Sequence, residues 1–387
     1  MVTRRDWLLA SGLFLAALFL RLWAVSYPPS KDFDEVYYVD AAESLLNGKG
    51  DPNWVHPPLG KLLIAGGIMI AGHNPFGWRL APVLSGAVCV LLVYLLSLKL
   101  FNSRAAASMT SLLLMLDPLS FVHSRIAMPD IFLPLFSLAA CLFLVQGAID
   151  RRRSSLWFAL SGLAIGAGIS VKWSLVPVLF VLSGSVFFMA KGKEDAITIG
   201  LRRLYLFFLV IPIAVYLLSY FFLFSAGGTI TDWLAFQGAM LNYHFTMKDT
   251  HPDALHPLLW WVGQHLYYVD YTTNAQIWAQ SNPFTWLPGA AATFYLGFEA
   301  VRRKRLYQLL PTLAFAAQYF MWFLSPRIVF IFYILPIVPF LHLSLGYCLA
   351  RVGTRGRVYA ALVAVYLAAA VLLFALDYSR LTGLNYF

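Results

Sequence analysis

A short stretch near the start of the chain contains the residue types that acid–base chemistry requires. Residues 31–40 contain four carboxylates, and residues 54–61 add a histidine and a lysine. They are Asp32, Asp34, Glu35 and Asp40, followed by His56 and Lys61. Charge at this density is costly to bury beside apolar segments, so the stretch faces water or a polar cleft. A carboxylate among cations indicates a general base beside a site for an anionic group such as phosphate.

The segments that must position these residues are those of an integral membrane protein. Of 387 residues, 60% are hydrophobic and 12% are charged, whereas soluble domains have about 25% charged residues. The net charge of +10 lies in short clusters between apolar runs, a pattern of membrane topology rather than of nucleic-acid binding. Cys89, Cys141 and Cys348 each lie in an apolar run, so they indicate neither a disulfide framework nor a metal site.

About eleven apolar segments are long enough to cross a bilayer as helices. They are expected at residues 7–26, 79–100, 104–122, 131–149, 155–171, 173–190, 204–225, 285–301, 306–324, 328–350 and 358–377. Lys172-Trp173 divides one long run into two of these spans, because a lysine belongs at a membrane boundary rather than in lipid. The expected fold is therefore a single all-α polytopic membrane domain over residues 1–387.

The distribution of charge predicts the orientation of this domain. Most lysines and arginines fall at the N-terminus and in every second loop, and most acids fall on the other side. The positive-inside rule then places the N-terminus in the cytoplasm and the C-terminus outside. Two long loops, 27–78 and 226–284, face outward, and we expect the active site on that side.

The first external loop is expected to contain two short helices. Residues 36–46 have the periodicity of a helix on the membrane surface. Its apolar face is expected to contain Tyr37, Tyr38, Ala41, Ala42 and Leu45. Pro57-Pro58 begins a second helix over 59–71, which is too short to span the bilayer. Because Asp34 precedes the first helix, a helix cap is the alternative to a catalytic role.

Several further motifs, in collinear order from about residue 30 to 346, together resemble the protein O-mannosyltransferases. These are polytopic GT-C glycosyltransferases that use a polyprenyl-phosphate sugar. The motifs are Phe33-Asp-Glu-Val-Tyr37, His56-Pro-Pro-Leu-Gly-Lys61, Asn74-Pro-Phe-Gly-Trp-Arg79, Asp117-Pro118, Arg125-Ile-Ala-Met-Pro-Asp130, Lys172-Trp173, Tyr243-His244, Thr250-His-Pro252, Asn282-Pro283 and Ser325-Pro-Arg327.

The resemblance implies an inverting transfer of a hexose, mannose in this family, to a Ser or Thr hydroxyl of a protein acceptor. Asp34 matches the expected catalytic base, and Glu35 would support it or position the acceptor. The cations expected at the donor phosphate are Arg327, Arg125, Lys172, His56 and Lys61. The residues expected at the acceptor or behind the reacting groups are Asp130, Tyr243, His244, His251 and Asn282. The partners implied are the donor lipid and the acceptor, and the oligomeric state stays open.

Structural roles compete with these functional ones. Arg125 could pair with Asp130 or with Asp117, and Asp130 follows a proline as a helix cap would. Lys172 and Lys61 could extend to the membrane interface. Arg327 is the single basic residue in its external turn, against the charge rule, which favours a function for it.

Two departures from the family pattern leave the acceptor and the cofactor open. The second external loop, at about 59 residues, is too short for the β-trefoil domain of eukaryotic members. Its histidines could bind a divalent metal, but their spacing matches no zinc pattern, so no cofactor is expected with certainty. They are His244, His251, His256 and His265, with Asp249 and Asp253 nearby.

Two other functions remain as alternatives. Transfer to a lipid or cell-wall glycan, as in the aminoarabinose transferases, uses the same fold. A lipid or sugar transporter would place ionisable groups near the bilayer midplane, often within inverted repeats. Here the charges gather at one surface and no repeat is visible, which favours the enzyme.

Overall fold

The computed structural model describes residues 3–189, 195–247, 250–270 and 275–384. Helices form nearly all of this part of the chain, together with one antiparallel hairpin. The helices of the membrane region are α1 (Arg4–Leu22), α4 (Pro75–Phe101), α5 (Arg104–Met115), α6 (Pro118–His123), α7 (Phe132–Ile149), α8 (Ser154–Val171), α9 (Val176–Phe188), α10 (Ala196–Tyr205), α11 (Ile211–Ser219), α12 (Phe221–Ser225), α14 (Pro283–Arg302), α15 (Leu310–Phe320), α16 (Val338–Gly353) and α17 (Arg357–Thr382).

Five helical segments in the described ranges are long and apolar enough to cross a membrane. They are Pro75–Phe101, Pro129–Ile149, Arg151–Val171, Ile197–Ser219 and Arg357–Thr382. The expected all-α, multi-helix membrane fold is confirmed. The division expected at Lys172 is also confirmed, because α8 ends at Val171 and Lys172 has extended backbone before the short turn η3 (Trp173–Leu175).

Four of the expected spans are wrong as continuous α-helices: 204–225 is interrupted at Tyr220, and the other three are interrupted near prolines. The segment 104–122 breaks after Met115, and Asp117 and Pro118 then begin α6. The segment 306–324 is α15 between two short 3₁₀ turns, and 328–350 begins with the turn η8 (Ile331–Ile334) before α16. A proline occurs at or near each of these three breaks, and it both removes a backbone donor and keeps the preceding residue out of the helical region.

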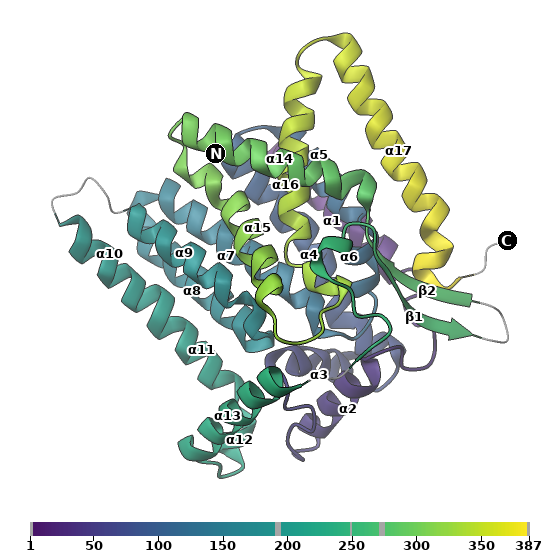
Figure 1. Cartoon of the computed structure of the whole chain (residues 1–387), viewed down its shortest axis with the longest axis vertical. Helices are drawn as coiled ribbons and strands as arrows, with labels where there is room; N and C mark the ends of the chain where they lie inside the picture. Colours follow the sequence, from purple (N-terminus) through teal and green to yellow (C-terminus); the bar gives the residue numbers. More distant parts are fainter. Residues whose placement is uncertain (1–2, 190–194, 248–249, 271–274, 385–387) are drawn as a thin grey trace.

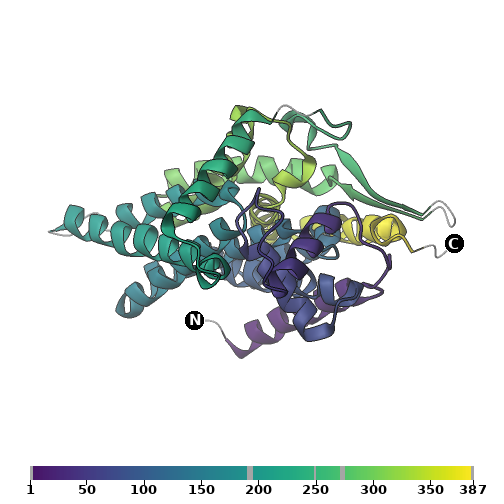
Figure 2. The same cartoon turned by 90° about the horizontal axis from the view of Figure 1, so that it is seen from below.

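Helices from the two long loops, 27–78 and 226–284, lie at one end of the molecule. Helices α2 (Glu35–Leu46), α3 (Leu59–Ala71) and α13 (Ile230–Thr246) gather at the lower end in Figure 1, opposite the α14–α15 and α16–α17 connections. Strands β1 (Gln264–Asp270) and β2 (Ala275–Gln280) form the hairpin, which packs against α17 as the turned view in Figure 2 also shows. Most of the candidate site residues lie on or next to these elements.

The helices expected in the first loop are confirmed, with one shift of face. α2 and α3 begin and end within one residue of the expected bounds. However, Tyr37 is 63% exposed, and the buried side of α2 instead includes Glu35 and Val39 beside Tyr38. Tyr38, Ala41 and Ala42 are buried as expected, and periodicity of apolar residues alone does not report the buried ion pair of Glu35.

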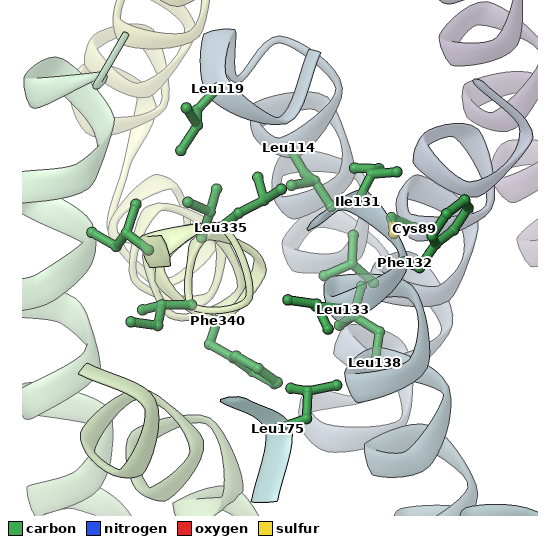
Figure 3. Packing of buried hydrophobic residues seen from close by; sticks show 14 of the residues in the cluster. Cys89, Leu114, Leu119, Ile131, Phe132, Leu133, Leu138, Leu175, Leu335 and Phe340 are labelled. Atoms are coloured by element: carbon green, nitrogen blue, oxygen red, sulfur yellow. The ribbon is translucent and has the colours of Figure 1, made fainter. Parts of the chain in front are cut away.

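A hydrophobic core between α5, α7 and α16 fixes the segments that lead into the site. Figure 3 shows Leu114, Ile131, Leu133, Leu175 and Leu335 converging there. Leu175 lies three residues after Lys172, and Leu335 directly follows η8. Close side-chain packing is the main source of helix association inside a bilayer. The core therefore holds the starts of η3 and α16 in place, close to the cations described next.

Candidate active site

A cavity of about 310 Å³ lies where the two long loops meet the ends of the membrane helices. Its volume is within the range of small-ligand pockets. The polar and aromatic side chains that line it include His56, Asp130, Lys172, Trp173, His244, Trp322, Arg327 and Tyr333. Five of the residues predicted for the site are therefore brought together here from five separate segments: His56, Asp130, Lys172, His244 and Arg327.

Asp34 stands beside this cavity at the start of α2. It occupies the N-cap position with helical dihedral angles. The structure describes every residue of α2, and the Asp34 side chain makes no capping hydrogen bond to any of them. Burial raises the pKa of Asp34 to about 6, the nearby Lys172 ammonium opposes that rise, and Asp130 adds to it. The helix-cap alternative is wrong for this carboxylate, and its pKa suits a general base near neutral pH.

The residue before Asp34 has an unusual backbone. Phe33 has φ +45°, in the left-handed region that disfavours side chains other than glycine, at a cost of about 1–2 kcal/mol. Its ring stacks on Tyr267 of β1 at 4.5 Å and meets the edge of His265 at 4.8 Å. Phe332 of η8 contacts the same ring at 6.3 Å. The aromatic contacts hold the strained turn that presents Asp34, so the hairpin supports the start of α2.

Glu35 is fully buried in an ion pair with Arg79 of α4. Arg79 Nε donates to Glu35 Oε1 at 2.8 Å and Nη2 donates to Oε2 at 2.7 Å. The backbone amides of Asp32 and Ala127 donate to the same carboxylate at 2.8 and 2.6 Å. Arg79 also donates to the carbonyls of Val25, Pro28 and Ser30. With both oxygens occupied, Glu35 acts by fixing the loop around Asp34 rather than by touching a substrate.

Lys172 and Asp130 form a second ion pair, which lines the cavity. Lys172 Nζ donates to both carboxylate oxygens of Asp130 at 2.9 Å, and both side chains are largely buried. The alternatives for these residues are therefore wrong: Asp130 pairs with Lys172 rather than capping a helix, and Lys172 turns inward rather than toward the membrane interface. Their joint charge near Asp34 is close to neutral.

Arg327 faces the cavity between two side chains. Its Nη1 lies 2.7 Å from His244 Nδ1, and its Nη2 donates to the Tyr333 hydroxyl at 2.6 Å. The His56 ring stacks on His244 at 5.3 Å. Burial lowers the pKa of His244 to about 4 and lowers that of His56 well below its usual range, and Arg327 and Lys172 contribute to both. Both imidazoles are neutral near pH 7, so Arg327 and Lys172 supply the positive charge.

Arg125 and Lys61 stabilise the fold around the site. Arg125 donates to the carbonyls of Arg21, Trp23 and Ala24 at 2.8, 2.7 and 3.2 Å, at the end of α1. Lys61 pairs with Asp51 and donates to the carbonyls of Asn53 and His56 at 2.6 and 2.8 Å. Within the described ranges, the cavity lining includes neither side chain.

Three residues expected at the acceptor or behind the reacting groups lie apart from one another, each with its own contacts. Tyr243 meets the edge of Trp54 at 5.9 Å, beside the cavity. Asn282 caps α14 by accepting from the Thr285 amide at 3.3 Å. His251 lies 3.6 Å from Asp253, which also contacts His265 at 3.3 Å. In the part of the chain that the structure describes, which leaves out Asp249, no group of three or more such side chains could hold a metal ion.

Two residues of the site were missed in the sequence. Tyr333, the second partner of Arg327, lies in a segment expected to be a continuous span, and only Leu335-Pro336 signals a break there. Arg79 was noted only as a motif residue, and nothing local identifies Glu35 as its partner 44 residues away.

Comparison with known proteins tests the family resemblance. Residues 69–225 match the family model described as dolichyl-phosphate-mannose-protein mannosyltransferase. A polyprenol-phosphate-mannose–protein mannosyltransferase of Mycobacterium tuberculosis is 27% identical over 98% of this chain and 89% of its own length. The chain matches the protein O-mannosyltransferase family along most of its length. The family resemblance seen in the sequence motifs is confirmed.

Solved structures agree on the fold. The S. cerevisiae protein O-mannosyltransferase Pmt1–Pmt2 complex bound to the sugar donor matches 99% of this chain and 91% of the compared chain, with a TM-score of 0.87 and 15% identity. ArnT from Cupriavidus metallidurans bound to undecaprenyl phosphate matches 98% of this chain and 73% of its own, with a TM-score of 0.62 and 18% identity. The chain therefore has the GT-C fold, and the match to the first structure spans nearly the whole chain.

Proposed function

We propose that this protein transfers mannose from a polyprenyl-phosphate donor to a Ser or Thr hydroxyl of a protein acceptor. One observation carries most weight: the Asp34 carboxylate is half-buried, makes no capping bond to α2, and lies beside a cavity with two cations. The family and the names of its relatives supply the sugar, the lipid phosphate and the protein acceptor.

The side chains suit a single displacement with inversion. The acceptor oxygen attacks the anomeric carbon while Asp34 takes the hydroxyl proton. The bond between that carbon and the phosphate oxygen breaks, and its electrons leave with the polyprenyl phosphate. Arg327 and Lys172 face the negative charge that develops on the phosphate, and the planar guanidinium suits two phosphate oxygens. Asp130 keeps Lys172 directed into the cavity.

A transfer assay in detergent tests this function. Purified protein would receive polyprenyl-phosphate-linked radiolabelled mannose and a Ser/Thr-rich peptide. Asp34→Asn is the test variant, and Asp40→Asn removes an exposed carboxylate from the same helix as the control. We expect label on the peptide with the wild type and the control but not with Asp34→Asn. Donor hydrolysis without labelled peptide would instead indicate a lipid or glycan acceptor, and no donor consumption would refute the proposal.

We place the site on the outer face of a prokaryotic cell membrane, with the N-terminus in the cytoplasm. The charge distribution supports this orientation. Lys49 is exposed in the first external loop, and Arg152 is exposed at the opposite end. With the three native cysteines replaced, Lys49→Cys should react with an impermeant thiol reagent in intact cells. Arg152→Cys should react only after permeabilisation, and the reverse pattern would invert the orientation.

A further inference from the structure

The hydrogen bonds around His244 fix its tautomer. An arginine only donates, so His244 Nδ1 must accept from Arg327 Nη1 at 2.7 Å. The other ring nitrogen, Nε2, lies 2.9 Å from the carbonyl oxygen of Val55, which only accepts. Nε2 therefore has the proton, and the ring is neutral. Both nitrogens are occupied, so neither is available to bind an acceptor hydroxyl or to take its proton.

His244 also joins segments that are far apart in the sequence. It lies near the end of α13 in the second long loop, while Val55 and His56 belong to the first. The edge of its ring meets Trp173 at 6.2 Å, next to Lys172. Arg327 comes from a fourth segment, before η8. The hydrogen bond from Arg327 to His244 thus links the guanidinium to the backbone of the first loop, because His244 also bonds to the Val55 carbonyl.

We propose that His244 is a positioning residue for the donor: it holds Arg327 against the cavity, so that its loss weakens binding of the donor phosphate and not of the acceptor. This assignment rests on the proposed function, and it places His244 behind the donor site, one of the two positions that the sequence analysis left open. Without His244, Arg327 keeps Tyr333 as its one described hydrogen-bond partner at the guanidinium tip, and the flexible side chain samples positions away from the phosphate. A hydrogen bond to a charged group contributes about ten- to hundredfold in binding.

Two substitutions each keep one of the two hydrogen bonds of His244 and remove the other. In His244→Asn the amide oxygen reaches the position of Nδ1 and can accept from Arg327, but the side chain is too short to reach Val55. In His244→Gln the amide nitrogen reaches the position of Nε2 and can donate to Val55, but Arg327 loses its acceptor. His73→Gln is the matched control, because His73 is half-exposed, pairs with Glu43 and does not line the cavity in the described ranges.

The kinetic test measures KM for the mannose donor at saturating peptide and KM for the peptide at saturating donor. We expect His244→Gln to raise the donor KM about tenfold or more, with peptide KM unchanged. His244→Asn should stay within about threefold of the wild type, and His73→Gln should match it. In an Arg327→Ala background, His244→Gln should add nothing to the donor KM, even if it also lowers thermal stability.

Three results would overturn the assignment: an unchanged donor KM in His244→Gln, an effect on the peptide KM alone, or a full additional loss in the Arg327→Ala background. Equilibrium binding of unlabelled polyprenyl phosphate separates this inference from the proposed function. If the wild type binds the lipid phosphate but consumes no mannose donor, the proposed reaction is refuted. The positioning role still requires that His244→Gln bind the lipid phosphate more weakly than the wild type does. If His244→Gln then binds it as well as the wild type does, the positioning role fails too.

Discussion

The raised pKa of Asp34 determines where activity is lost on the acid side. A general base works only when it is ionised, so activity must fall as the pH drops through the pKa of that base. The pKa of a solvated aspartate is near 4, and burial raises that of Asp34 to about 6 in spite of Lys172. The fall in activity on the acid side of the pH–activity profile, its acid limb, should therefore lie about two pH units higher than it would with an exposed carboxylate as the base.

The size of the effect follows from the same value. With a pKa of about 6, the ionised share of Asp34 is about nine tenths at pH 7 and about one tenth at pH 5, so kcat/KM should fall about tenfold between them. The cavity histidines do not produce this limb. The pKa of His244 is lowered to about 4, and burial lowers the pKa of His56 well below its usual range.

The assay is the initial rate of mannose transfer from pH 4.5 to 8 at constant ionic strength, with unfolding followed at each pH. Asp40→Asn is the control, because this exposed residue shares α2 with Asp34 but only pairs with Lys31 at the surface. It should keep the limb near pH 6. A rate that stays flat down to pH 5 in the wild type would refute the reasoning, since the carboxylate would then titrate as a solvated one. So would an unchanged limb in an active Asp34→Asn variant.

Further predictions concern the buried ion pair of Glu35 with Arg79 and the cavity cation Arg327. Glu35→Gln leaves Arg79 buried without its carboxylate, so it should cost about 3–5 kcal/mol of stability; a melting temperature in detergent equal to that of the wild type would contradict the assignment of Glu35 to the fold. Arg327→Lys keeps a charge but not the forked geometry, so the donor KM should rise about tenfold, and about a hundredfold in Arg327→Ala. Changes confined to the peptide KM would remove Arg327 from the donor phosphate.

Local features of the site were predictable from the sequence because their causes are local. Helix α2 lies where amphipathic spacing predicts it, and α3 begins where Pro57-Pro58 indicates. The break at Lys172 follows from the cost of a charge in lipid. The dense acidic stretch contains Asp34, and the family resemblance singled it out as the base. The structure adds the observation that Asp34 makes no capping bond to α2.

The features of the site that the sequence did not predict depend on partners that are distant in the sequence. Lys172 meets Asp130 across 42 residues and Arg327 meets His244 across 83, and no local pattern fixes either pair. Arg125 and Lys61 look the same in the sequence as the cavity cations, yet they donate to backbone carbonyls. Which cations face the cavity is decided by how the loops fold over one another.

The left-handed backbone at Phe33 limits how the sequence next to Asp34 can change over evolution. Glycine would relieve the backbone but remove the ring that fills the space between Tyr267 and His265. A β-branched residue would keep apolar volume but tolerate the dihedral angle even less. Asparagine would accept the angle and bring an unpaired amide into an aromatic environment. None of these three substitutions satisfies both the backbone and the aromatic packing, so the two requirements together constrain the residue that precedes Asp34.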